Sequence, residues 1–431
     1  MPMKRAIEIC VVGTTLLISL SARSQLSATS VLPRATTTGS VLKGSVYGGR
    51  RPVSGASIYL YAAGSGGYGT ATQNLLTSAV TTNSTGNFDV SGKYSCAAGQ
   101  QMYLVSLGGS TVLGKNNAAG FMAALGDCSW LSSSRYISMN EVTTVAGAFA
   151  LAPFMTSYSA VSSSATNYAG MVRAFASARK LANVATGQSP GGGLALGATS
   201  PVSEVYTVAN VLAACVKSSG GVAGDGSTCG KLFASATPAG GFSPTETIGL
   251  ALAMAHHPTL NVATQFSYTG PLSAFGGQLT SAPKDWTMSI SYAGFHAPKS
   301  TTIDAAGNVW VANSGNSTVT VLAQSGAVVR TLSGNGLSSP AAVAIDVNGS
   351  GFVANRGASS VSGFTSKGVA LSGSPFAVGA GPAALAFDGG GFLWVANSAG
   401  NSVSELNGAG TPVQAISTGV MAPTAVAINP Q

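Results

Sequence analysis

The spacing of apolar residues changes twice along the chain and divides it into three parts. Residues 40–115 contain short runs in which apolar and polar residues alternate between glycine-rich turns, a pattern typical of half-buried strands. Residues 116–283 carry apolar side chains at helical spacing, and residues 284–431 return to strand-like runs. The pattern predicts a multidomain chain with a β-sandwich, then a small all-α helical module, then a second β segment.

The last segment repeats itself about every 42 residues. Its copies begin at prolines that are 42, 42 and 41 residues apart, and an Asp, an aromatic residue and an Asn follow six, twelve and fifteen residues later. These positions are Pro298, Pro340, Pro382 and Pro423; Asp304, Asp346 and Asp388; Trp310, Phe352 and Trp394; and Asn313, Asn355 and Asn397. A period of about 40 to 45 residues with four short strands is typical of a β-propeller blade.

The repeat resembles the NHL repeat over about residues 298–431, because it contains P-x-x-[IV]-A-x-D, G-N-[VL]-[WY]-V-A-[ND] and N-x-V segments in the same order. The chain as a whole resembles exported, acidobacterial-type NHL-repeat proteins. The resemblance implies three complete blades in an incomplete ring. "PTAVAINPQ" at the end matches only the first strand of a fourth blade, and "DWTMSISYAG" from Asp285 is expected to supply one strand ahead of the first. An arc of this kind needs cover from the helical module or from a second chain in a homodimer.

The residues repeated in every copy favour structural roles. We expect the aromatic residue to fill the space between blades, and the Asp and Asn to bind turn N–H groups. The alternative is a ring of axial ligands, as in lactonase-like propellers. A ligand set would differ from blade to blade, whereas these residues are copied.

The first β segment resembles carboxypeptidase regulatory-like and Cna B-type sandwiches. The resemblance lies in "GSVYGGRRPVSGASIYLY" and "TTNSTGNFDV". Such modules serve as spacers or binding platforms, and some carry a Lys–Asn isopeptide bond promoted by a buried acid. Lys43 is an early-strand lysine, but no Glu occurs between Glu8 and Glu141, so we do not expect this bond.

The N-terminus predicts export. Residues 1–24 have a basic start, a short apolar stretch and small residues near the end, as in a cleaved signal peptide, and residues 25–39 read as a linker. Later apolar runs are too short to span a membrane. A secreted or periplasmic location favours disulfides among Cys96, Cys128, Cys215 and Cys229. Their order suggests Cys96–Cys128 and Cys215–Cys229, although spacing permits three pairings.

Composition argues against several classes of function. Only 7% of the residues are charged, and the net charge of +8 comes from Lys and Arg residues scattered along the chain, so we expect no nucleic-acid partner. "GQSPG" at residues 187–191 fits a nucleophile elbow, but Pro190 lacks the N–H of an oxyanion hole, and we interpret it as a linker. "GSTVLGKN" at residues 109–116 lacks the Ser or Thr of a P-loop and reads as a loop between domains.

The histidines and two glutamates of the predicted helices also have structural explanations. His256 and His257 are adjacent and point in different directions on a helix, which disfavours a shared metal. Glu141 suits the first turn of a helix, and Ser243 with Glu246 suggests a capping box with Pro244 at the first helical position. We predict no cofactor and no metal.

Two functions remain. The first is an exported non-enzymatic binding or scaffold protein that presents its blades to a protein or glycan partner. The alternative is a propeller enzyme resembling streptogramin lyases or gluconolactonases. Residues 300–431 contain no histidine, and their only acids are Asp304, Asp346, Asp388 and Glu405, which favours the binding function.

Overall fold

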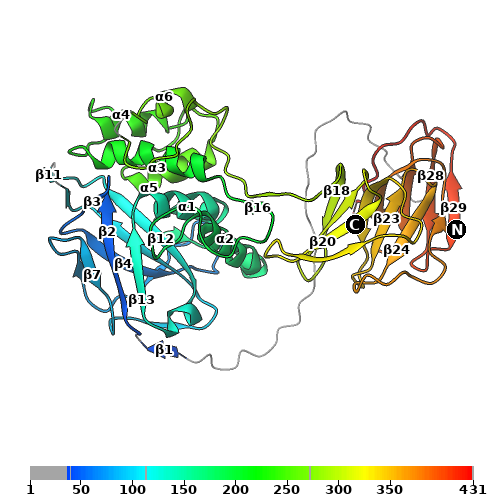
Figure 1. The fold of residues 1–431 in the computed structure, drawn as a ribbon, viewed down its shortest axis with the longest axis horizontal. Coiled ribbons are helices and arrows are strands. Elements are labelled where there is room, and N and C mark those ends of the chain that lie inside the picture. Colours follow the sequence, from blue (N-terminus) through cyan, green and yellow to red (C-terminus); the bar gives the residue numbers. More distant parts are fainter. Residues whose placement is uncertain (1–35, 39, 112–113, 271–272, 430–431) are drawn as a thin grey trace. The chain divides into compact units, whose positions relative to one another are not determined.

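The computed structural model describes residues 36–38, 40–111, 114–270 and 273–429, which divide into two compact bodies (Figure 1). The α/β body contains the described residues of 29–194 and 198–291, and the repeat body contains residues 195–197 and those from 292 onward. The predicted signal peptide lies outside the described residues. Part of the predicted linker is a strand, because β1 (Thr36–Thr38) pairs with β8 (Ser95–Ala97).

Two sheets form the sandwich of the α/β body. One consists of β12 (Gly120–Asp127), β9 (Gln101–Leu107) and β4 (Ser57–Ala62), with β5 (Gln73–Asn74) and β6 (Val80–Thr81) both paired to β4. In the other, β2 (Leu42–Gly48) pairs in parallel with β13 (Arg135–Met139) and antiparallel with β3 (Arg51–Pro52) and β7 (Asn87–Asp89). Apolar side chains between the sheets are fully buried, including Val46, Leu60, Leu104, Phe121 and Ile137.

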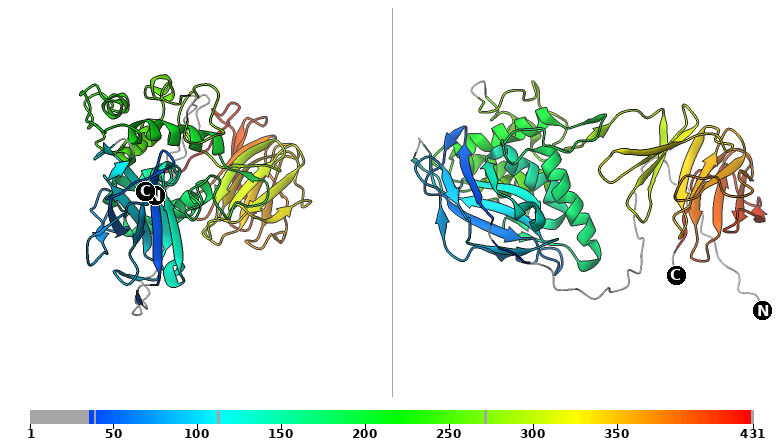
Figure 2. Two further views of the ribbon diagram at one scale, coloured as in Figure 1. Left: turned by 60° about the vertical axis from the view of Figure 1, so that its left-hand side comes forward. Right: turned by 60° about the horizontal axis from the view of Figure 1, so that its bottom comes forward.

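Figure 2 shows the six α-helices of the described residues gathered on one side of the strands. They are α1 (Glu141–Leu151), α2 (Tyr168–Leu181), α3 (Val202–Val216), α4 (Thr228–Ser235), α5 (Thr247–His256) and α6 (Val262–Phe266). Among the described residues of this body, helices α1, α2 and α5 contact β12 of the first sheet, and α3, α4 and α6 pack beside them. Short 3-10 turns occupy Cys128–Ser132, Ala152–Phe154 and Ala165–Asn167, and β14 (Met155–Ser157) pairs with β15 (Ala160–Val161). In the described part of the chain, no helix has the length and apolar character needed to cross a bilayer.

The helical segment begins later than the apolar spacing predicts. Residues 120–127 and 135–139 form strands β12 and β13 rather than helices. Strand β12 is apolar on both faces, because Phe121 and Leu125 face the sandwich core while Met122 and Ala124 face the helices. Such a run has no alternation, and periodicity alone does not separate it from a buried helix. "GSTVLGKN" likewise is no loop between domains: it contains the hairpin of β10 (Ser110–Thr111) and β11 (Gly114–Lys115), which joins two strands of one sheet.

Trp286 belongs to the α/β body and not to the repeats. Its indole Nε1 donates a hydrogen bond to Gln265 Oε1 at 2.5 Å, and its side chain is buried among the helices. The predicted extra strand from Asp285 is therefore absent from residues 285–290. Only Ser291–Tyr292 (β17) is a strand there, and it pairs with β16 (Ala198–Thr199).

The repeat body contains three antiparallel four-stranded sheets, each a simple meander. Their strands are β18 (Pro298–Ile303), β19 (Val309–Asn313), β20 (Thr318–Leu322) and β21 (Val328–Leu332); β22 (Pro340–Ile345), β23 (Gly351–Asn355), β24 (Ser360–Phe364) and β25 (Phe376–Ala377); and β26 (Pro382–Phe387), β27 (Leu393–Asn397), β28 (Ser402–Leu406) and β29 (Pro412–Ile416). The repeated proline pairs with the repeated asparagine in every sheet, as in Pro340 with Asn355. First strands of successive sheets contact each other, β18 with β22 and β22 with β26.

The repeated aromatic side chain lies in the apolar layer between neighbouring sheets. Trp310 packs with residues of the first and second sheets, and Phe352 packs with residues of the second and third. Trp394 contacts a last layer to which Val426 and Ile428 contribute. The terminal segment does not form the strand that its match to a fourth blade predicts, but it does place these two apolar side chains on the third sheet.

Both predicted disulfides are present in the structure. Cys96 is bonded to Cys128, and Cys215 is bonded to Cys229. The second bond joins α3 to α4 across 14 residues.

The contribution of the disulfide between α3 and α4 to the free energy of unfolding should be measurable in the purified protein. In the chain-entropy model, closing a loop of this size contributes roughly 3 kcal/mol. We expect the double substitution of Cys215 and Cys229 by Ser to lower the free energy of unfolding by an amount of this order in urea titrations. Recovery of either cysteine as a free thiol in non-reducing peptide maps of the wild-type protein would contradict the assignment.

Candidate functional site

The repeated aspartates cap tight turns. Asp346 lies between the first and second strands of its sheet, and its Oδ1 accepts hydrogen bonds from the backbone N–H of Asn348 at 2.9 Å and of Ser350 at 2.7 Å. Gly349 within this turn has a φ of 81°, which glycine adopts without strain. The equivalent contacts are Asp304 with Asn308, and Asp388 with Gly390 and Phe392.

Two of these aspartates also hold the repeated tryptophan. Asp304 Oδ2 accepts a hydrogen bond from Trp310 Nε1 at 3.1 Å, and Asp388 Oδ2 accepts one from Trp394 Nε1 at 3.2 Å. The second sheet has Phe352 at this position, and the phenylalanine side chain has no N–H to donate. Burial raises the pKa of Asp304, but hydrogen bonds from Asn308 and Trp310 outweigh it, so the pKa lies below its ordinary value.

The repeated asparagines bind hydroxyl groups of the next strand, in addition to one backbone N–H contact of the predicted kind. Each amide Nδ2 donates to two hydroxyl groups on the next strand; for Asn355 these are Ser360 Oγ at 3.1 Å and Ser362 Oγ at 2.8 Å. The same contacts join Asn313 to Thr318 and Thr320, and Asn397 to Ser402 and Ser404. Asn355 Oδ1 also accepts the N–H of Ser338 at 3.3 Å. The hydroxyl residues five and seven positions after each Asn are a sequence signal for this arrangement.

Glu405 completes the set of acids between residues 300 and 431. Its Oε2 accepts a hydrogen bond from Gln414 Nε2 on the neighbouring strand. Each of the four carboxylates in this part of the chain therefore accepts a hydrogen bond from its own sheet.

Removal of the Asp346 carboxylate tests its structural role. Asp346→Ala leaves two turn N–H groups without their acceptor, so we expect the free energy of unfolding to fall by about 1–2 kcal/mol. Asp346→Asn keeps an acceptor oxygen and serves as the matched control, which should lose less. A variant that releases a bound metal at an unchanged melting temperature would instead support the axial-ligand interpretation.

Two glutamates lie where helices of the α/β body begin, Glu141 fully buried and Glu246 partly buried. Glu141 lies in the first turn of α1, as predicted, and its Oε1 accepts the N–H of Gly49 at 2.6 Å. Its Oε2 has no hydrogen-bond partner among the residues that the structure describes. Burial raises the pKa of Glu141 to about 7, although the Gly49 N–H and the charge of Lys217 lower it.

Glu246 is itself the N-cap of α5, which differs from the predicted capping box. The helix begins at Thr247, and the Glu246 carboxylate accepts the N–H groups of Ile248 and Gly249. Ser243 Oγ instead contacts Thr237 Oγ1 at 2.8 Å. The hydroxyl of Thr247 is bound to the backbone of Gly120 in β12, and this tertiary contact sets the start of the helix. Burial raises the pKa of Glu246 to about 7, opposed by those N–H groups.

The raised pKa values of Glu141 and Glu246 predict a pH dependence of stability. Both pKa values are raised from 4.5 to about 7, so between these values the folded protein binds more protons than the unfolded chain. Stability should fall as pH rises from about 5 to 7.5, by up to roughly 3 kcal/mol for each residue. We expect Glu141→Gln to flatten this dependence in urea titrations, whereas Glu204→Gln on α3 should leave it unchanged. An identical slope in Glu141→Gln and the wild type would contradict the assignment.

An open pocket of about 460 Å³ lies in the α/β body, where β2, β13, the start of α1, α3 and two loops meet. It is lined by Ser45, Tyr47, Arg50, Ser138, Met139, Asn140, Thr186, Gly187, Gln188, Tyr206, Ala274, Phe275 and Gly276. Sequence reasoning missed this pocket, because its residues come from five separate stretches of the chain. One segment of its lining is "GQSPG", which we interpret from the sequence as a linker.

The structure supports the linker interpretation of "GQSPG". The motif follows helix α2 through a loop, and no strand leads into it. Its Ser189 is buried, and its backbone carbonyl accepts a hydrogen bond from Tyr206 Oη at 2.8 Å. The motif thus forms part of the pocket wall.

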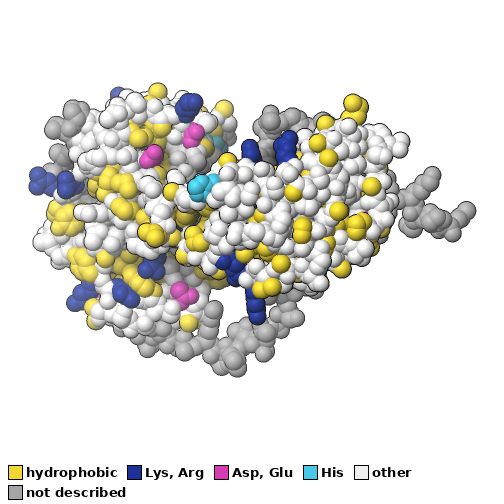
Figure 3. Space-filling view, turned by 45° about the vertical axis from the view of Figure 1, so that its right-hand side comes forward, with side chains coloured by type: hydrophobic (Ala, Val, Ile, Leu, Met, Phe, Trp, Pro, Cys, Tyr) yellow, Lys and Arg dark blue, Asp and Glu magenta, His cyan; other side chains and the backbone are white. Residues whose placement is uncertain are grey.

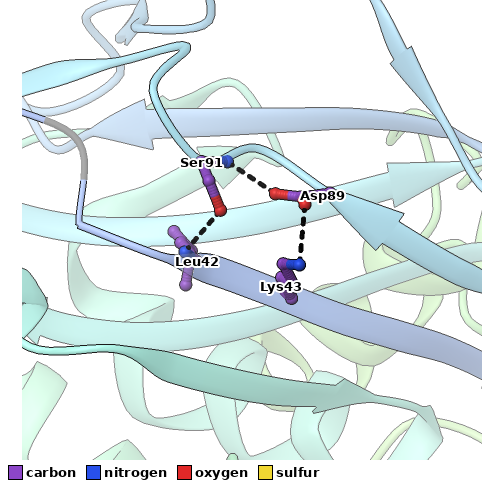
Figure 4. Close-up of polar contacts among 4 residues, drawn as sticks. All are labelled: Leu42, Lys43, Asp89 and Ser91. Carbon is purple, nitrogen blue, oxygen red and sulfur yellow. Dashed lines mark hydrogen bonds and ion pairs between the residues drawn. The ribbon is translucent and has the colours of Figure 1, made fainter.

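Lys43 forms an ion pair. Its Nζ lies 3.2 Å from Asp89 Oδ2 on the neighbouring strand, with both side chains about half exposed (Figure 4). The side chain and backbone of Ser91, and then Lys43, hold the pKa of Asp89 below its ordinary value. Isopeptide chemistry uses a buried acid, whereas this pair faces solvent.

The histidines of "HHP" are placed as expected at the end of α5. His256 is the last helical residue, and its Nε2 lies 2.9 Å from the carbonyl oxygen of Ala152. The His257 ring is nearly perpendicular to that of His256, with ring centroids 6.5 Å apart. Within the residues that the structure describes, no three His, Cys, Asp or Glu side chains are grouped to hold a metal ion. Lys and Arg side chains lie in separate small groups on the face shown in Figure 3.

Comparisons with known proteins detect only partial similarity. No protein-family model matches the chain, and no curated protein matches its sequence. Similar solved structures include Kuenenia stuttgartiensis hydrazine synthase (21% identity over 31% of this chain and 39% of that chain, TM-score 0.28) and a streptogramin B lyase (18%, 28% and 41%, TM-score 0.26). A protein of unknown function from Desulfotomaculum acetoxidans matches with 20% identity, 33% and 48% coverage, and a TM-score of 0.27. This chain spans less than half the length of each of the three.

Proposed function

We propose that the chain is an exported, non-enzymatic binding protein in which the three repeat sheets are NHL-like propeller blades of an incomplete ring. The blades act as a scaffold that presents the molecule to a protein or glycan partner. The observation that carries this proposal is the engagement of Asp304, Asp346, Asp388 and Glu405 in hydrogen bonds within their own sheets. Carboxylates used in this way hold the fold together.

Three features support the blade interpretation. The first strands of successive sheets contact each other, as the inner strands of neighbouring blades do. An apolar layer centred on Trp310 or Phe352 lies between each pair of sheets. The first two strands pair in the same register in all three sheets. A single four-stranded sheet cannot cover its own faces, so stacked copies stabilise one another.

Export is part of this proposal. The N-terminal sequence has the pattern of a signal peptide, and the two disulfides are compatible with an extracellular protein. The sandwich, which resembles carboxypeptidase regulatory-like modules, would then act as a further spacer or platform.

The alternative function is a propeller enzyme resembling streptogramin lyases or gluconolactonases. Such enzymes need a general base and metal ligands near the propeller axis. The repeats contain no histidine after residue 300, and their acids already accept hydrogen bonds. These facts favour binding over catalysis.

Testing the purified full chain for both binding and ring-opening activity distinguishes the two functions. We expect binding to at least one member of a glycan array or one purified surface protein. We also expect an unchanged chromatographic retention time for quinupristin, because a lyase would open its ring without changing its mass. For gluconolactone we expect no more addition of water than in a protein-free control, both in the presence of Mg²⁺ or Ca²⁺. Ring opening of either compound that is lost in an Asp346→Ala, Asp388→Ala double variant would overturn the proposal and establish the enzyme.

A further inference from the structure

The pocket of the α/β body has the composition of a carbohydrate site. We propose that it binds a sugar ring of a glycan, with Tyr206 and Phe275 forming the apolar wall and with Arg50, Thr186 and Gln188 binding hydroxyl groups. This inference rests on the binding function proposed above and assigns it a place and a ligand class. Its volume of about 460 Å³ falls within the range of about 300–1,000 Å³ of small-molecule sites.

The apolar wall consists of aromatic rings held in fixed orientations. The rings of Tyr206 and Phe275 are nearly parallel, with an angle of 4° between their planes and 6.1 Å between their centroids. Tyr47 from β2 adds a third ring that is 39% exposed. Aromatic faces suit the C–H face of a sugar ring, because aromatic side chains combine a large apolar surface with little conformational entropy to lose.

Helix α3 fixes the loop that carries Phe275. Asn210 Oδ1 accepts the Phe275 N–H at 2.9 Å, and Asn210 Nδ2 donates to the Phe275 carbonyl at 2.8 Å. Thr207 Oγ1 accepts the N–H of Leu279 at 2.8 Å, further along the same loop. A wall that is already held in place loses little conformational entropy when a ligand binds.

Other residues that line the pocket offer hydrogen-bonding side chains that the protein does not use. The side chains of Thr186, Gln188 and Arg50 are exposed, and no hydrogen bond joins them to another residue in the described part of the chain. Arg50 follows Gly49, whose N–H is held by Glu141, so the turn that carries the guanidinium is anchored. A hydroxyl, an amide and a guanidinium provide both donors and acceptors, which is what the hydroxyl groups of a sugar require.

The charge of the pocket limits the type of sugar. Arg50 is the single charged residue among those that line it, all of which the structure describes. One guanidinium accommodates a neutral sugar and can also pair with the carboxylate of a uronic acid. A cationic ligand would meet no opposite charge here.

The test uses the purified full chain on an array of neutral and uronic-acid oligosaccharides, followed by titration calorimetry with the strongest ligand. We expect Phe275→Ala and Arg50→Ala each to weaken binding about tenfold, which corresponds to about 1.4 kcal/mol. Phe242→Ala serves as the control, because Phe242 is fully exposed in the same body and does not line the pocket. Arg50→Ala alters an exposed turn side chain and should fold normally, which thermal melts will verify for both variants.

The outcomes distinguish this inference from the proposed function. Sugar binding that persists unchanged in both folded variants would overturn the pocket assignment while the binding function stands. Binding of a purified surface protein without any sugar would overturn the ligand class. Ring opening of a lactone would overturn the proposed function itself.

Discussion

The burial of strand β12 on both faces is the constraint that organises the α/β body. Phe121, Ala123 and Leu125 pack into the sandwich, and Met122 and Ala124 pack against the helices. A sheet covered on one face by another sheet and on the other by helices forms one cooperative core. Because β12 belongs to both layers, the sandwich and the helices fold as a single body, and the loops where they meet acquire fixed positions. The pocket lies among those loops.

Two acidic side chains lie where the helices begin beside the sheets, and their pKa values are raised there. Glu141 is a fully buried acid at the start of α1, and Glu246 is a partly buried acid at the start of α5. Each satisfies backbone N–H groups that would otherwise be buried without a partner, and each has a raised pKa in return. Glu141 also fixes the turn at Gly49 and therefore the backbone beside Arg50. An acid that looks like an ordinary first-turn residue in the sequence thus supports one edge of the pocket.

Features defined by short-range order were predictable from the sequence. The repeat of four strands depends on a period, and the first turn of α1 at Glu141 depends on neighbouring residues. The order of the cysteines suggested the disulfide pairing that the structure shows, although spacing left three pairings open. Features set by tertiary contacts were not predictable. Strand β12 lacks alternation because both of its faces are buried, and helix α5 starts at Thr247 because that hydroxyl binds Gly120. The pocket was missed because Arg50, Gln188 and Phe275 are far apart in the sequence and no motif links them.

The two bodies differ in how they use their polar side chains, and this difference bears on where specificity can evolve. In the repeat body, the Asp turn contacts and the Asn–hydroxyl contacts recur in all three sheets. Each sheet needs the same turn and the same strand pairing, so a contact that recurs in every sheet stabilises the fold of that sheet. In the α/β body, the residues around the pocket occur once, and Asn210 and Glu141 hold their backbone while the exposed side chains remain open to solvent. A residue present once can change without disturbing a repeated architecture. The proposed sugar site therefore lies in the body whose polar residues can change without affecting the repeats.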